Sequence, residues 1–116
     1  MADSLSHLTG ALRAFAAERE WEVYHTPKNL AMALTGEAGE LAAEFQWLTD
    51  PESRDLDPAR LERVRQEAAD VLLYLVRLAD QLHFDLVEAA SDKMAINAQR
   101  YPADKARGNA RKYGEL

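Results

Sequence analysis

The sequence predicts an all-α protein with four helices and a basic C-terminal tail. Only 5 of the 116 residues are Gly and 4 are Pro, and no alternating apolar and polar runs are separated by hairpin turns. Ala, Leu, Glu and Arg, which favour helices, dominate the chain. Apolar residues recur at spacings of three and four. The length suits one domain over residues 1–116, with the tail from about residue 101.

The first two helices are expected over residues 4–20 and 27–47. Thr26 can cap the second helix, and Pro27 suits its first position because an N–H there would have no partner. The first helix carries an apolar stripe at helical spacing. The residues of this stripe are Leu5, Leu8, Leu12 and Phe15.

The last two helices are expected over residues 58–82 and 86–100. A loop over residues 49–58, rich in Asp and Pro, comes before the first of them, and an Asp-Pro pair again marks the helix start. Asp85 and Glu88 have the spacing of a capping box, which places the next helix start.

Composition limits the possible partners and the compartment. The 14 Lys and Arg against 20 Asp and Glu give a net charge of −6, which argues against binding a nucleic-acid polymer. The absence of cysteine excludes disulfides and thiolate metal sites. The longest apolar run, residues 71–76, is far shorter than the ~20 residues of a membrane helix. With no secretory signal visible, we expect a soluble cytoplasmic protein without a membrane partner.

The charge is divided unevenly along the chain. Residues 1–92 carry 8 basic and 18 acidic side chains, whereas residues 93–116 carry 6 basic and 2 acidic ones. A basic tail on an acidic body suggests that the tail contacts a neighbouring subunit or an anionic ligand. The alternative is a solvated, loosely ordered chain end.

Two acidic pairs have matched positions. Glu37 and Glu40 lie one turn apart in the second helix, as do Glu67 and Asp70 in the third. The pairs Glu37–Asp70 and Glu40–Glu67 have the same midpoint, which falls in the loop over residues 49–58. In an antiparallel hairpin the four carboxylates would therefore converge between the two helices.

Such a cluster favours a cation. Like charges one turn apart destabilise a helix by roughly 0.2–0.5 kcal/mol. Only Arg63 stands three or four positions from any of the four acids, four positions before Glu67. An all-oxygen ligand set suits Mg²⁺ or Mn²⁺. Gly36 and Gly39 suggest a close approach of another backbone or of a ligand. Glu44 either extends the cluster or lies on the surface, and ordinary solvent-facing acids are the alternative throughout.

Aromatic and polar residues near these acids are candidates for ligand contact. A planar base could stack on tryptophans that bracket the acidic helix, although core packing is an equally simple role for aromatic residues. A polar stripe on the fourth helix is either functional or merely solvated. The candidates are Trp21, Tyr24, His25, Trp47, Tyr74, Lys93 and Asn97, with Tyr101 next on the stripe.

The segments GEAGE and EAAD resemble the E-x-x-E…E-x-x-D pattern of the MazG-type nucleoside triphosphate pyrophosphohydrolases, and most closely the dCTP pyrophosphatase branch. Further blocks that carry the resemblance are FAAEREWEVYH, PKNLAMALTGEAGELAAEFQW, EAADVLLYLVRLA, SDKMAINAQRYP and ARKYGEL. They extend from about Phe15 to Leu116 and occur in the same order.

The resemblance implies a helical, bundle-like protein that forms a homotetramer from pairs of dimers. It implies Mg²⁺-dependent hydrolysis of a nucleoside triphosphate, such as dCTP or a modified dCTP, to the monophosphate and pyrophosphate. Leu12 stands where animal members carry a base-contacting His, which leaves base preference open, and Glu44 has no counterpart. The matching metal ligands are Glu37, Glu40, Glu67 and Asp70. The matching pocket positions are Trp21, His25, Trp47 and Tyr74, with Lys93 and Asn97 as further polar residues.

Two other classes of protein are compatible with parts of the sequence. A di-iron carboxylate bundle uses Glu-x-x-His pairs. The pair Glu22–His25 has this spacing and Asp80–His83 approximates it, but both histidines lie beside helix boundaries. A non-catalytic helical module that binds a nucleotide or a protein is the second alternative.

Overall fold

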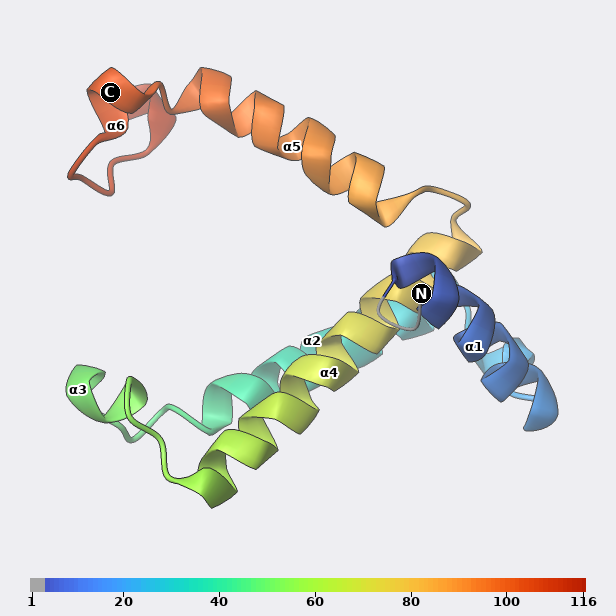
Figure 1. Ribbon diagram of the computed structural model, residues 1–116. Helices are drawn as coiled ribbons and strands as arrows, with labels where there is room; N and C mark the ends of the chain where they lie inside the picture. Colours follow the sequence, from blue (N-terminus) through green and yellow to red (C-terminus); the bar gives the residue numbers. More distant parts are fainter. Residues whose placement is uncertain (1–3) are drawn as a thin grey trace. The chain divides into compact units, whose positions relative to one another are not determined.

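The computed structural model describes residues 4–116, and it is helical throughout, with no strand in that range (Figure 1). Two compact units, Met1–His83 and Phe84–Leu116, are described separately. The first unit contains α1 (Leu5–Glu18), η1 (Glu22–Tyr24), α2 (Pro27–Ala43), α3 (Asp50–Ser53) and α4 (Pro58–Gln81). The second contains α5 (Leu86–Arg100), α6 (Ala103–Ala106) and η2 (Tyr113–Glu115). The all-α prediction and the four main helices are confirmed.

The predicted helix starts are confirmed by their capping hydrogen bonds. The Thr26 hydroxyl accepts from the backbone N–H of Asn29 at 3.2 Å. The Asp57 carboxylate accepts from Arg60 N–H at 2.9 Å, and Asp85 does the same for Glu88 at 2.8 Å. Pro27 and Pro58 each occupy the first turn. Each start is therefore encoded locally, by a cap and a residue that needs no hydrogen-bond partner.

Two predicted segments differ from the structure, and the tail contains short helical turns that were not predicted. Helix α2 ends at Ala43 rather than at residue 47, because the chain turns over residues 44–47. The predicted loop contains α3, which a Thr49–Glu52 capping box stabilises. The tail also contains α6 and η2, so it is not a simple extended end.

The tail is anchored to the end of α5 within its own unit. The Tyr113 ring meets the Tyr101 ring edge-on, with centroids 6.1 Å apart. The guanidinium of Arg100 lies 4.9 Å from the centroid of the Tyr113 ring. These contacts fold the chain end back onto the last turn of α5.

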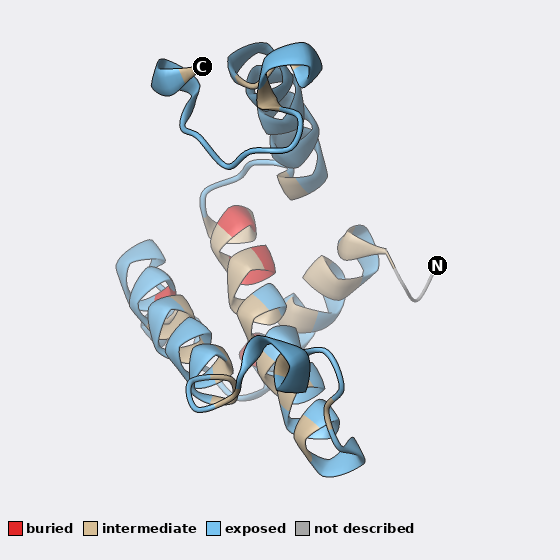
Figure 2. Cartoon of the chain, turned by 90° about the vertical axis from the view of Figure 1, so that its left-hand side faces the viewer, coloured by how far each residue is buried: buried red, intermediate tan, exposed pale blue. Residues whose placement is uncertain are grey.

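The core of the first unit is small, and Figure 2 shows how few positions are fully buried. Helix α4 packs along α2 and against α1. Fully buried apolar side chains come from all three helices: Ala16, Leu30, Val76 and Ala79. The predicted stripe of α1 is half-buried at its leucines, whereas Phe15 is exposed and meets the Trp21 ring edge-on at 5.8 Å. No helix in residues 4–116 has the length and apolarity needed to cross a membrane.

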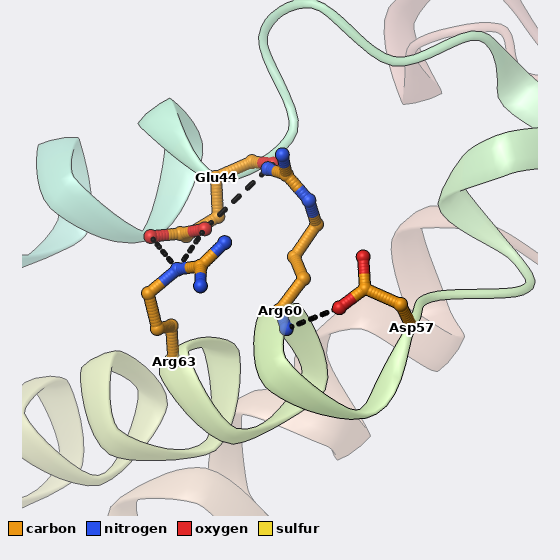
Figure 3. A network of polar contacts seen from close by, with 4 residues as sticks. All are labelled: Glu44, Asp57, Arg60 and Arg63. Atoms are coloured by element: carbon orange, nitrogen blue, oxygen red, sulfur yellow. Dashed lines mark hydrogen bonds and ion pairs between the residues drawn. The ribbon is translucent and has the colours of Figure 1, made fainter.

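Glu44 and two arginines close the loop end of the α2–α4 hairpin (Figure 3). Arg63 Nε donates to both carboxylate oxygens of Glu44, at 3.1 and 3.3 Å. Arg60 Nη1 donates to the backbone carbonyl of Glu44 and lies 3.4 Å from its Oε1. Arg63 lies one helical turn from Glu67 in the sequence, but it pairs with Glu44, which offers a half-buried carboxylate across the hairpin. Glu44 therefore links α2 to α4, and within residues 4–116 Glu67 forms no ion pair with a basic side chain.

Candidate metal centre and adjoining pocket

Three carboxylates converge between α2 and α4. Glu37 comes from α2, and Glu67 and Asp70 come from consecutive turns of α4; each is half-buried. One oxygen from each lies within 4.8 Å of the others. The convergence expected from the common midpoint is therefore present for these three residues, because the two helices pack antiparallel.

Glu40 lies beside this group and is more exposed. Its carboxylate acts on both Glu37 and Glu67, raising the pKa of each. Glu40 is therefore an electrostatic member of the cluster, although its oxygens lie outside the group of three. Because α2 places Glu40 one turn from Glu37, the same helix face supplies both residues.

The cluster lacks compensating positive charge. Burial, with Glu37 and Glu40 nearby, raises the pKa of Glu67 to about 7. Burial also raises the pKa of Glu37, and the charges of Glu40 and Asp70 add to this, although its contact with Glu67 opposes it. Oε2 of Glu37 and Oε2 of Glu67 are shielded from solvent and accept no hydrogen bond within residues 4–116. Carboxylate oxygens that lack hydrogen-bond partners are suitable ligands for a hard divalent cation.

In the absence of divalent ions, the Glu67 contribution to stability is expected to fall as pH rises. The pKa of Glu67 is about 7 in the folded chain and 4.5 ordinarily, so the folded state retains a proton that the unfolded state loses. The contribution is complete below pH 4.5 and is lost as pH rises through about 7. Melting temperatures in EDTA between pH 4.5 and 7.5 measure it.

The matched variant for this measurement is Glu67→Gln. The melting temperature of the wild type minus that of the variant should fall across this pH range. The subtraction removes the opposite contribution of His25, whose pKa is lowered by burial and by the charge of Arg77. A difference that stays constant or rises with pH would contradict the assigned environment of Glu67.

An aromatic pocket of ≈ 210 Å³ adjoins the acidic cluster, and Asp70 belongs to both. Its walls come from α1, α2, α4 and the connection before α2. The lining residues are Leu12, Phe15, Trp21, His25, Leu30, Asp70, Leu73, Tyr74 and Arg77. A neighbouring hollow shares Trp21, His25 and Tyr74 and adds Tyr24 to its wall. The fold thus places an apolar, aromatic surface directly beside a group of carboxylates.

The remaining sequence candidates are not among the lining residues of these two hollows. Trp47 follows α2 and is 86% exposed. Lys93 and Asn97 are exposed on α5, in the second unit. Apart from the backbone of α2 itself and the adjacent residues, no atom of the described chain lies within 4 Å of the position that a side-chain carbon would take at Gly36 or Gly39. The close approach expected at these glycines is therefore not made within residues 4–116.

Sequence reasoning missed a charged network behind the pocket. Arg77 is only 5% exposed. Its Nε donates to His25 Nδ1 at 3.2 Å, and its Nη1 donates to Asp80 at 3.1 Å. Arg13 on α1 also donates to Asp80, from Nε at 2.8 Å and Nη2 at 2.5 Å. The available signal was one Arg within the apolar run VLLYLVRLA. Because His25 and Asp80 have these partners, the network disfavours the di-iron alternative.

Replacing Asp80 by Asn is expected to destabilise the fold by about 3 kcal/mol, because it leaves the buried Arg77 guanidinium without its counter-charge. Chemical denaturation of both proteins measures the change. Arg13→Met is the control, and its loss of stability should be much smaller because Arg13 is a largely exposed partner. Equal losses of unfolding free energy in Asp80→Asn and Arg13→Met would argue that the buried Arg77 guanidinium does not depend on the charge of Asp80.

Comparison with known proteins places the chain in a family. Residues 33–116 match the model of the MazG-like family. The chain belongs to the MazG-like family. The crystal structure of a pyrophosphatase from Archaeoglobus fulgidus superposes with a TM-score of 0.80 at 39% identity, covering 84% of this chain and 92% of that one.

Curated relatives of this MazG-like chain are similar over most of its length. It is 51% identical over 104 residues to dCTP pyrophosphatase 1 of Homo sapiens, which covers 88% of this chain and 61% of the relative. It is 49% identical, with the same coverage, to dCTP pyrophosphatase 1 of Mus musculus. The chain thus spans about three-fifths of the length of these relatives.

Proposed function

We propose that this chain hydrolyses a nucleoside triphosphate, dCTP or a modified dCTP, to the monophosphate and pyrophosphate. The observation that carries the proposal is the position of Asp70, which joins a carboxylate cluster to an aromatic pocket. A ligand that fits both parts has a planar end and a polyanionic end that binds metal. The name dCTP pyrophosphatase 1 of the relatives supports this choice of nucleotide.

The residues proposed to hold the metal are Glu37, Glu40, Glu67 and Asp70. Their oxygens suit Mg²⁺ best and Mn²⁺ next, and two buried oxygens lack any other partner in the described chain. A divalent ion bound there supplies positive charge to phosphate oxygens and lowers the pKa of a coordinated water. The positive charge of the ion would offset the repulsion among the four carboxylates.

The protein contributes orientation and proton transfer. The aromatic pocket holds the base, so that the phosphates extend from Asp70 toward the other acids. A carboxylate of the cluster accepts a proton from the attacking water. The new bond joins water oxygen to the α-phosphorus, and the bond from that phosphorus to the bridging oxygen breaks, releasing pyrophosphate. Lys93, Asn97 and the basic tail are proposed to stabilise the leaving pyrophosphate, from the same subunit or a neighbouring one.

Trp21→Ala is expected to raise KM about tenfold, because stacking of an aromatic side chain on a base contributes roughly 1–3 kcal/mol. Trp21 lines the pocket together with His25 and Tyr74. Steady-state kinetics with dCTP measures the effect, and Trp47→Ala in parallel tests whether the exposed tryptophan also meets the base. An unchanged KM in Trp21→Ala would move the base out of this pocket.

We further propose that residues 1–116 act as one domain and associate as a dimer of dimers. Helix α5 has no buried residue, and its Val87, Met94 and Ile96 are exposed. Met32 on α2 is also 66% exposed. Exposed apolar side chains such as these are stabilised when another subunit covers them. Sedimentation equilibrium should give a mass four times 13.0 kDa, and a monomer would contradict this assembly.

A panel of nucleoside triphosphates with pyrophosphate as the readout tests the activity. We expect Mg²⁺-dependent release of one pyrophosphate per dCTP, and turnover of a 5-methylated dCTP in the same assay. Binding of dCTP without turnover would instead support a non-catalytic nucleotide-binding module. A cytoplasmic location, where nucleoside triphosphates are made and used, follows from this proposal.

A further inference from the structure

We propose that Arg77 is a positioning residue, which fixes His25 as a hydrogen-bond donor toward the ligand in the aromatic pocket. The inference rests on the proposed function only in taking that ligand to be a nucleotide. His25 and Arg77 both line the pocket, but they come from the connection before α2 and from α4, 52 positions apart in the chain.

The contact between the two side chains determines the tautomer of His25. Arg77 Nε lies 3.2 Å from His25 Nδ1 and donates its hydrogen to it. A guanidinium has donors only and remains protonated in proteins, so it cannot accept a hydrogen bond from the ring. Nδ1 must therefore carry a lone pair, and the single proton of the neutral imidazole lies on Nε2.

The position of Arg77 is itself fixed by charge and burial. Its Nη1 donates to Asp80, which Arg13 holds from the other side with two hydrogen bonds. Because a planar guanidinium with several fixed partners cannot rotate freely, its Nε–H keeps one direction. Its charge also opposes a second proton on the neighbouring ring. His25 is thus held both in one tautomer and in one orientation.

This arrangement gives the pocket a directed polar group among largely apolar walls. Within residues 4–116 no group hydrogen-bonds to Nε2 of His25, so this N–H is available to a ligand. It can pair only with an acceptor. The carbonyl oxygen or the unprotonated ring nitrogen of a pyrimidine such as cytosine meets this requirement, whereas an exocyclic amino group does not. Arg77 therefore determines which atoms of the base can pair with His25.

The tautomer can be measured in the free wild-type protein by long-range ¹H–¹⁵N correlation spectra. His25→Gln identifies the His25 signals among the 3 histidines. We expect His25 protonated at Nε2 alone at neutral pH. In Arg77→Met the ring should become a mixture of tautomers. Arg13→Met keeps the direct contacts of Arg77 with His25 and Asp80, so it should leave the tautomer unchanged. A wild-type ring protonated at Nδ1, or an unaltered tautomer in a folded Arg77→Met, would overturn the proposal.

Two substitutions of His25 test the donor itself. In His25→Gln the side-chain amide reaches the position of Nε2 and offers an N–H, whereas the shorter His25→Asn can replace only Nδ1. Asn should raise KM for dCTP by about 2- to 10-fold, the value of one hydrogen bond, with Gln close to wild type. Arg77→Met combined with His25→Asn should be no worse in KM than His25→Asn alone. Equal effects of Gln and Asn would contradict the donor role.

The spectra also separate this proposal from the proposed function, because they need no nucleotide. If the wild type hydrolyses no nucleoside triphosphate, the proposed function is wrong. The measured tautomer of His25 still tests whether Arg77 positions the ring. If Arg77→Met does not fold, the wild-type tautomer and the Gln–Asn comparison decide it.

Discussion

Asp70→Asn and Glu67→Gln are each expected to lower kcat/KM for pyrophosphate release by about 10²–10³-fold, because a bound metal contributes several kcal/mol of transition-state stabilisation. Both residues belong to the group whose oxygens lie within 4.8 Å. Each substitution keeps the size of the side chain and removes one anionic ligand. Release of pyrophosphate from dCTP at saturating Mg²⁺ measures the loss, and circular dichroism checks that the fold is retained.

Glu44→Gln is the matched control for this prediction. It makes the same chemical change one turn beyond Glu40, but Glu44 contacts Arg60 and Arg63 instead of the cluster. Its activity should remain within a few-fold of wild type, while its stability falls modestly. If Asp70→Asn and Glu67→Gln both keep wild-type activity, the metal centre has been assigned to the wrong residues. If Glu44→Gln is as inactive as they are, hairpin packing explains the losses instead.

Saturating Mg²⁺ is expected to raise the melting temperature by roughly 10 °C. A ligand present at 100 times its Kd stabilises the folded state by about 2.7 kcal/mol, and about 4 °C per kcal/mol is usual for a domain near this size. The effect should be large because the metal also relieves repulsion among Glu37, Glu67 and Asp70. Without metal, one buried oxygen of Glu37 and one of Glu67 have no hydrogen-bond partner within residues 4–116. Differential scanning fluorimetry with and without Mg²⁺ measures the shift.

The same melting measurements on Glu67→Gln are expected to differ from those on the wild type both without and with Mg²⁺. At neutral pH without metal, the variant should melt higher than wild type, because one member of a like-charged cluster has been neutralised. Its Mg²⁺-dependent shift should be much smaller. A wild-type melting temperature that is the same in Mg²⁺ and in EDTA would argue against a metal site. A Mg²⁺-dependent shift in Glu67→Gln as large as that of the wild type would argue against a site that uses Glu67.

Several features of this protein could be predicted from sequence because their causes are local. Caps at Thr26, Asp57 and Asp85 mark helix starts, since each side chain bonds to an N–H only three residues away. Residues 44–57, which include α3, then turn the chain back so that α4 can pack antiparallel to α2. Glu37 and Asp70 lie equally far along the chain from the middle of the predicted loop over residues 49–58. Antiparallel packing of the two helices brings such positions level with each other, so the cluster was predictable from residue numbers.

What only the tertiary structure decided involves partners far apart in the chain. Arg63 pairs with Glu44 and not with Glu67, because packing of α2 on α4 places the half-buried Glu44 carboxylate beside the Arg63 guanidinium. The pairing of Arg77 with His25 spans 52 positions, and that of Arg13 with Asp80 spans 67. No local spacing encodes such contacts. They form because packing of α1 and α2 on α4 buries a charge, which then requires a partner at that point in space.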